Sequence, residues 1–124
     1  MAKILVVDDE KQIRDMLTQI LTRAKHEVEL AEDGVIALQK YRASSFDLII
    51  TDLMMAKKNG LELIREISRE FGEVRVIAIS GGIPTSPSDY YLSVAKLMGA
   101  SKILDKPFTK VELLAAVDAL LAQE

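Results

Sequence analysis

Four short runs of Ile, Val, Leu and Ala stand out in the pattern of apolar and polar positions along the chain. They occupy residues 4–7, 48–50, 76–79 and 103–104. Each run is bounded by polar or turn residues, which is typical of strands buried on both faces of a parallel sheet. A fifth segment, residues 26–30, alternates polar and apolar side chains and therefore predicts a strand half exposed at a sheet edge.

Segments with the spacing of amphipathic helices separate these strands. Start signals stand at Asp33-Gly34, at Asn59-Gly60, at Ser86-Pro87 and in a capping box over residues 109–112. The side chains expected to face the core in the first, third and last helices are Ile13, Leu17, Ile20, Leu21 and Ala24; Leu61, Ile64, Ile67 and Phe71; and Leu114, Val117 and Leu121.

This alternation predicts five β-α units. Right-handed crossovers then place helices on both faces of one parallel five-stranded sheet. Because the second strand is half exposed, it belongs at an edge, which favours the strand order 2-1-3-4-5. We therefore predict an α/β fold, a flavodoxin-like (βα)5 three-layer sandwich, that forms a single domain over residues 1–124.

Polar side chains follow the predicted strands where each strand ends. Asp8 and Asp9 follow the first strand, Asp52 ends the third, Ser80 ends the fourth and Lys106 follows the fifth. The carboxyl ends of parallel strands meet at one edge of the sheet, and open α/β sheets bind their ligands there. We expect these five side chains to share one crevice.

Composition narrows the choice of partners. The net charge of −3 and the pI near 5.2 argue against a direct nucleic-acid partner. The chain has no cysteine, which excludes thiolate metal sites, and no apolar run approaches the roughly 20 residues of a membrane span. A cytoplasmic domain with no membrane partner is expected.

The predicted carboxylate cluster calls for a cation. At about 4 Å and an effective dielectric near 20, each like-charged pair costs on the order of 4 kcal/mol. Mg²⁺ binds a few carboxylate oxygens together with water and phosphate oxygens. We predict Asp9 and Asp52 as direct ligands, Asp8 as a ligand through water, and the backbone carbonyl of Met54 as a further ligand.

Lys106 and Ser80 add groups that a metal site alone does not need. An ammonium and a hydroxyl facing a carboxylate–Mg²⁺ pair form a receptor for a phosphoryl group. Carboxylates also act as nucleophiles that become aspartyl phosphates. Asp52 is the predicted nucleophile, because it lies on the central strand between the Asp8-Asp9 pair and Lys106.

The ordered set of motifs resembles the receiver domain (CheY-like) of two-component response regulators, over essentially the whole chain. The motifs that carry the resemblance are VVDDE at residues 6–10, DLIITDLMM at 47–55, NG at 59–60, ISG at 79–81, MGA at 98–100 and KPF at 106–108.

The resemblance implies a phosphorylation-activated switch, not a small-molecule enzyme. A sensor histidine kinase or a phosphotransfer protein would donate the phosphoryl group to Asp52, with Mg²⁺ held by Asp8, Asp9 and Asp52. Ser80 and Lys106 would then contact the phosphoryl group, and Lys106-Pro107 would be a cis peptide. The readout would be the face of the fourth helix, fifth strand and fifth helix, which includes Tyr90, Tyr91, Lys96, Ile103 and residues 115–122. That face would bind a downstream protein or mediate a phosphorylation-dependent dimer.

The chain departs from the family pattern at several positions. Ala56 stands where proline is common, and Ile103 stands where an aromatic switch residue is usual, so the switch would depend on Ser80 and on loop and helix movement. The loop of residues 81–85 is longer than usual. Met54 and Gly82 stand where the family varies its dephosphorylation rate, and neither side chain can orient water. We therefore predict a long-lived phosphoryl group.

Four alternatives remain open from the residues. Asp8-Asp9 could serve only as a helix cap. The domain could be a magnesium-dependent aspartyl-phosphate hydrolase, although Asp52 lacks the second acid of an Asp-x-Asp motif. It could be a flavodoxin-like electron carrier, although residues 8–10 would repel a flavin phosphate. It could also be a pseudo-receiver that only binds proteins.

Overall fold

The computed structural model of the chain describes residues 2–53, 59–80 and 101–122, and for Ser80 it describes the backbone alone. Predictions about Met54, Ala56, Gly82 and the helix that starts at Ser86 lie outside the described residues. The strands are β1 (Lys3–Val7), β2 (Glu27–Ala31), β3 (Leu48–Asp52), β4 (Val76–Ser80) and β5 (Lys102–Asp105). The helices in the described part are α1 (Lys11–Arg23), α2 (Gly34–Ala43), α3 (Gly60–Phe71) and α5 (Lys110–Leu121).

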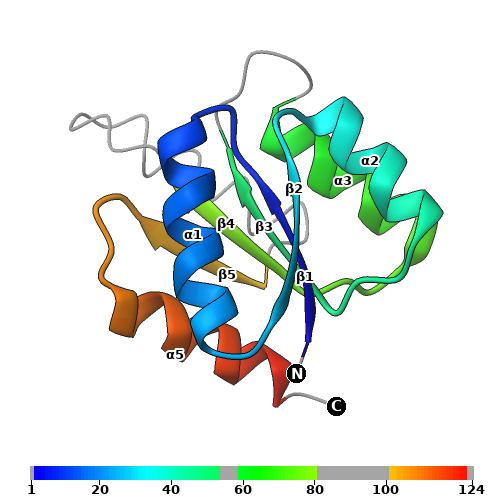
Figure 1. The fold of residues 1–124 in the computed structure, drawn as a ribbon. Helices are drawn as coiled ribbons and strands as arrows, with labels where there is room; N and C mark the ends of the chain where they lie inside the picture. The colour runs from blue at the N-terminus through cyan, green and yellow to red at the C-terminus, as the bar shows by residue number, and fades with distance from the viewer. Residues whose placement is uncertain (1, 54–58, 81–100, 123–124) are drawn as a thin grey trace.

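The five strands form one parallel sheet in the order β2-β1-β3-β4-β5, as predicted. Figure 1 shows α1 and α5 on one face of this sheet and α2 and α3 on the other. The register pairs Val7 of β1 with Thr51 of β3. The next residue of each strand is therefore an aspartate, Asp8 or Asp52, and the two stand level at the carboxyl edge.

The core lies in two layers, one on each side of the sheet, because successive strand side chains point to opposite faces. In β1, Ile4 and Val6 pack toward α1 and α5, whereas Leu5 and Val7 pack toward α2 and α3. All four are at most 1% exposed. The sequences of such central strands are continuous apolar runs because both faces of the strand are buried.

Both edge strands are more exposed than the central ones. In β2 the side chains from Val28 to Leu30 are half-buried, which confirms the predicted edge position. In β5, Ile103 and Leu104 are only half-buried and both ends of the strand are exposed, so the prediction of full burial for this run was wrong. The physical reason is the topology, since β5 forms the opposite edge of the sheet.

The buried face of α3 differs from the prediction at three positions. Leu63, Ile64 and Ile67 are buried as a continuous stripe, whereas the prediction omitted Leu63 and included Leu61, which is only half-buried. Phe71 is 43% exposed and not part of the core. It is the last residue of the helix, and its ring forms an edge-to-face contact with the ring of Tyr41, with 4.8 Å between the centroids.

The buried face of α5 is also shifted from the predicted one. Its buried residues are Leu113, Ala116, Val117 and Leu120, and the predicted Leu114 and Leu121 are only partly buried. Leucines stand in pairs at both ends of this helix, so the same 3.6-residue spacing fits two stripes that differ by one residue. Hydrophobicity alone does not choose between them.

The predicted start signals are confirmed at three helices. The side chains of Asp33, Asn59 and Thr109 each accept a hydrogen bond from a backbone N–H in the first turn of α2, α3 and α5. At α5 the Glu112 carboxylate in turn accepts a hydrogen bond from the Thr109 N–H, which completes a capping box. Each such cap stabilises its helix by roughly 0.5–2 kcal/mol. No described helix combines the length and the apolar character that crossing a membrane requires.

Candidate functional site

Two aspartates stand side by side where β1 and β3 end. Asp8 follows β1 and is fully buried, and Asp52 is the last residue of β3 and 3% exposed. The chain leaves these adjacent strands toward opposite faces of the sheet, because α1 covers one face and α3 the other (Figure 1). This reversal is the place where open α/β sheets bind ligands.

Three hydrogen bonds hold Asp8 in place. Its backbone N–H donates to Ala31 O at 3.1 Å, its Oδ1 accepts from the Glu10 N–H at 2.8 Å, and its carbonyl accepts from Arg14 Nη1 at 2.6 Å. Its Oδ2 is buried and has no hydrogen-bond partner within the described part of the chain. An oxygen that is buried without a hydrogen bond is costly unless a cation lies nearby.

The environment of Asp8 raises the pKa of its carboxyl in the absence of a metal ion. The pKa is about 6, raised mainly by burial and also by the nearby carboxylates of Asp52 and Asp9. The Glu10 N–H and the Lys106 ammonium act in the opposite direction. Burial therefore outweighs the favourable contacts, and a divalent cation would reverse this balance.

Lys106 brings a positive charge to these carboxylates. Its Nζ lies 3.5 Å from Asp52 Oδ2, 3.6 Å from Asp8 Oδ2 and 3.9 Å from Glu10 Oε1. Burial lowers the pKa of Lys106, but the carboxylates of Asp52, Asp8 and Glu10 together raise it above its ordinary value. Lys106 is thus a fixed cation at the centre of the acidic group, as the sequence predicted.

A third and a fourth acid complete the site. Carboxylate oxygens of Asp8, Asp9 and Glu10 lie within 4.8 Å of one another, and Asp9 and Glu10 are exposed. The residues present fit a hard cation, because they offer oxygen ligands and include the buried Asp8 Oδ2 that lacks a hydrogen bond. Glu10 is not among the site residues predicted from the sequence, although it directly follows the two aspartates.

The interpretation of Asp8-Asp9 as a simple helix cap is wrong. Helix α1 begins at Lys11, its N-cap residue is Glu10, and no side chain accepts a capping hydrogen bond there. Asp8 instead turns its Oδ1 back to the Glu10 N–H, which leaves Oδ2 on the side of Lys106.

Gly60 lets α3 approach the end of β3 closely. A Cβ at this position would lie 2.1 Å from the carbonyl oxygen of Asp52 and 2.8 Å from Leu53 Cα. The Gly60 N–H donates to Leu53 O at 3.1 Å, and Leu53 N–H donates to Ile79 O at 3.0 Å. The helix N-terminus and the neighbouring strand thus fix the backbone that carries Asp52.

Of the remaining predicted residues, Ser80 ends β4 and pairs in register with Asp105, so its backbone lies at the same edge as Asp52. The Ser80 side chain and Met54 lie outside the described structure. The Lys106-Pro107 peptide is cis, as predicted. Ile103 is half-buried and packs on the cluster of Leu53, Ile64, Val76 and Ala78.

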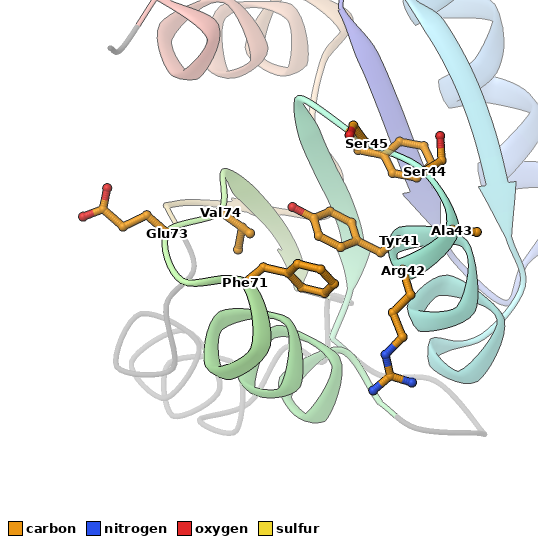
Figure 2. A pocket seen from close by; sticks show the side chains of 9 residues that line it. Tyr41, Arg42, Ala43, Ser44, Ser45, Phe71, Glu73 and Val74 are labelled. Carbon is orange, nitrogen blue, oxygen red and sulfur yellow. The ribbon is translucent and has the colours of Figure 1, made fainter.

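A cavity of about 420 Å³ lies near the amino ends of β3 and β4. Figure 2 shows its lining, which includes Tyr41 and Phe71 as well as Arg42. These residues come from the segments that precede β3 and β4, whereas Asp52 ends β3. The cavity therefore has no part in the acidic site.

The fold and site define a doubly wound α/β domain whose switch point carries a buried aspartate beside a lysine and further acids. The family model of the response regulator receiver domain matches residues 4–118. Among curated proteins, the chain is 37% identical over 125 residues to the response regulator ArlR of Staphylococcus saprophyticus, covering all of this chain and 54% of ArlR. It thus spans about half the length of the curated relatives it matches.

Solved structures agree with this result. The receiver domain of NtrX from Brucella abortus has a TM-score of 0.89 and 31% identity, with 98% of this chain and 99% of that chain covered. The response regulator TrrA from Thermotoga maritima, in complex with Mg(2+)-BeF, has a TM-score of 0.85 and 32% identity, with 97% and 99% covered. The chain belongs to the response regulator receiver domain family, whose members act in two-component signalling through a phospho-aspartate switch.

Family membership bears on two of the alternatives. The match to the receiver family over residues 4–118 favours a signalling domain over an aspartyl-phosphate hydrolase and over a flavodoxin-like electron carrier. The pseudo-receiver alternative is a member of the same family that binds proteins without being phosphorylated. A phosphorylation experiment distinguishes it from an active receiver.

Proposed function

We propose that Asp52 is the phosphoacceptor of this receiver domain. The observation that carries the proposal is the position of Asp52 at the carboxyl end of β3, 3% exposed, with Lys106 Nζ 3.5 Å from its Oδ2. A buried carboxylate beside a fixed ammonium is suited to attack phosphorus, because the ammonium neutralises charge that gathers on the phosphoryl oxygens.

The donor in this proposal is a phosphohistidine on a sensor histidine kinase or a phosphotransfer protein. A carboxylate oxygen of Asp52 forms a bond to phosphorus while the phosphorus–nitrogen bond of the phosphohistidine breaks, and the imidazole leaves and takes up a proton. Lys106 then pairs with a phosphoryl oxygen, and Ser80 donates a hydrogen bond to another. The domain assists its own phosphorylation and dephosphorylation and is not an enzyme for small molecules.

In this proposal, Mg²⁺ is held by Asp8, Asp9 and Asp52, with a further ligand from the Met54 carbonyl. When bound, it withdraws charge from the phosphoryl oxygens. Support comes from the carboxylate oxygens of Asp8, Asp9 and Glu10, which lie within 4.8 Å of one another, and from the buried Asp8 Oδ2. The complex of the relative TrrA with Mg(2+)-BeF is consistent with the same ligand chemistry.

The proposed readout is the face formed by the fourth helix, β5 and α5. Phosphorylation adds a charge of about −1.5 to −2 at one site and so biases a two-state element. Exposed positions on the described part of this face include Lys102 on β5 and Ala115, Asp118 and Ala119 on α5. In this proposal the face binds a downstream protein or a second copy of the domain. The chain spans about half the length of the curated relatives it matches.

Acetyl phosphate provides the direct test. The protein is incubated with acetyl phosphate and Mg²⁺ and weighed by intact-protein mass spectrometry, alongside the Asp52→Asn and Asp118→Asn variants. Asp118 is exposed on α5 and serves as the matched control. The wild type and Asp118→Asn should gain one phosphate that Asp52→Asn does not gain. No gain in the wild type would support the pseudo-receiver, and an equal gain in Asp52→Asn would contradict the choice of Asp52.

A further inference from the structure

Arg14 ties the acidic turn to the first helix at two points. Its Nη1 donates to the Asp8 carbonyl at 2.6 Å, and its backbone N–H donates to Glu10 O at 3.1 Å as the first hydrogen bond of α1. Arg14 is half-buried, and a hydrogen bond from a guanidinium is roughly twice as strong as a neutral one. A single residue thus fixes the backbone on both sides of Asp9.

This contact determines which atom of Asp8 faces the site. The carbonyl is held by Arg14, the N–H by Ala31 and the Oδ1 by the Glu10 N–H. With these atoms fixed, Oδ2 is directed toward Lys106 at 3.6 Å and has no hydrogen bond among the described residues. Without the Arg14 bond, the turn that orients this carboxylate would lose one of its three hydrogen bonds.

We propose that Arg14 is a positioning residue for the Mg²⁺ site, acting through the Asp8 carbonyl and not by contact with the ion. This inference rests on the proposed function. Groups that hydrogen-bond to metal ligands commonly change metal affinity by about 10–100-fold when they are removed. Arg14 performs this role from α1. Its positive charge repels the ion, but the fixed position of the Asp8 carboxylate strengthens Mg²⁺ binding by more than this repulsion weakens it.

The charge of Arg14 makes the proposal testable by the sign of the effect. If Arg14 acted only as a nearby charge, its removal would lessen the repulsion of a divalent cation and tighten Mg²⁺ binding. If Arg14 positions Asp8, its removal must weaken binding despite the gain of negative charge. The two interpretations thus predict opposite changes in the same quantity.

The experiment measures the Mg²⁺ dissociation constant by amide NMR titration of the wild type and of Arg14→Gln, Arg14→Lys and Arg23→Gln. Arg23 is exposed in the last turn of the same helix and provides the same charge change away from the turn. Arg14→Gln should weaken Mg²⁺ binding by about tenfold and Arg14→Lys by roughly threefold, because lysine keeps the charge and can still donate a hydrogen bond but lacks the planar guanidinium that holds Nη1 at the Asp8 carbonyl. Arg23→Gln should bind Mg²⁺ no more weakly than the wild type.

A second readout needs no metal ion. In EDTA, the Glu10 N–H, which donates to Asp8 Oδ1 at 2.8 Å, should exchange with solvent several-fold faster in Arg14→Gln than in Arg23→Gln. A purely stabilising role would change global exchange without singling out this amide. At saturating Mg²⁺, phosphorylation of Arg14→Gln by acetyl phosphate should return to within about threefold of the wild-type rate, since only metal affinity is impaired.

Binding of Mg²⁺ to Arg14→Gln that is unchanged or tighter would overturn the proposal, as would an unchanged Glu10 exchange rate. If Arg14→Gln does not fold, the same measurements on Arg14→Lys decide the question, with unchanged affinity again overturning the proposal. These failures differ from failure of the proposed function, which would appear as absence of phosphorylation in the wild type itself.

Discussion

The Nζ atom of Lys106 lies 3.5 Å from Oδ2 of Asp52, although 54 residues separate the two along the chain. β4 and β5 bring Lys106 to the carboxyl edge where β3 ends, because the sheet places parallel strands in register. The ammonium and a divalent cation would both interact with the carboxylates of Asp52 and Asp8. Competition between these two cations leads to the first prediction.

Lys106→Gln should bind Mg²⁺ more tightly than the wild type, by roughly threefold or more, because a competing positive charge is removed from the carboxylates. The same variant should be phosphorylated more slowly by acetyl phosphate, because the ammonium no longer neutralises the phosphoryl oxygens. Isothermal titration and mass spectrometry measure the two quantities. Lys102→Gln, at an exposed position of β5, is the matched control. Weaker Mg²⁺ binding in Lys106→Gln would contradict this account.

Asp8→Asn should stabilise the metal-free protein at neutral pH. The pKa of Asp8 is about 6 in the folded protein against 3.8 in the unfolded chain. Between these values the folded state holds a proton that the unfolded state has lost, so the free energy of unfolding falls as the pH rises through this window. The loss reaches up to about 3 kcal/mol above the folded pKa. Asparagine is neutral at all pH values and avoids it.

Urea denaturation in EDTA at pH 4 and pH 7.5 measures this effect. The free energy of unfolding of Asp8→Asn relative to the wild type should rise between the two pH values by about 2–3 kcal/mol. Asp118→Asn, at an exposed position of α5, should show no such rise. Mg²⁺ should stabilise the wild type and reduce the advantage of the variant. An advantage that is equal at both pH values would argue against the raised pKa.

The strand ends could be predicted from the sequence because period and composition alone mark them. Apolar runs ending in Asp8, Asp52 and Lys106 required only that parallel strands share an edge, and the distances of 3.5 and 3.6 Å confirm their convergence. The strand order followed from the single alternating segment at residues 26–30, which overlaps β2. In these cases the structure that the local sequence favours is the one that the whole fold requires.

Other features could not be predicted because they depend on packing between distant elements. Whether Leu113 or Leu114 faces the sheet is decided by the position of α5 against the core, which hydrophobicity does not encode. Phe71 was assigned to the core because it continues the spacing of α3, but the helix ends there and the ring lies against Tyr41. The role of Arg14 could not be predicted because its side chain donates to the backbone carbonyl of Asp8. Every residue has such a carbonyl, so the sequence does not indicate this contact.

The phosphoryl group on the phosphorylated protein should be hydrolysed slowly. The prediction comes from Met54 and Gly82, since neither residue has a side-chain group that can orient a water molecule for attack on phosphorus. Loss of the added phosphate, followed by mass spectrometry after removal of acetyl phosphate, measures the rate. Met54→Glu and Gly82→Asn should each accelerate it, because both introduce groups that hydrogen-bond to water. Hydrolysis as rapid as in the quickest receivers would contradict the prediction.

Gly60→Ala should impair both stability and phosphorylation. The added methyl group would lie 2.1 Å from the Asp52 carbonyl oxygen, so α3 must move away from the strand that carries the phosphoacceptor. Overpacking against backbone costs typically about 1–3 kcal/mol, and we expect a loss at the upper end of this range together with a slower gain of phosphate from acetyl phosphate.

Gly72→Ala is the informative comparison for this variant. Gly72 has a φ of +78° with a ψ of −133°, and no atom lies within 4 Å of an added Cβ, so the cost of the substitution is backbone strain of about 1–3 kcal/mol with no contact to the site. Gly72 follows α3 and precedes β4, so it lies near the amino end of that strand, away from the carboxyl end where Asp52 stands. Its substitution should lower the free energy of unfolding without slowing phosphorylation. Equal slowing in the two variants would show that general destabilisation, and not displacement of Asp52, explains the effect of Gly60→Ala.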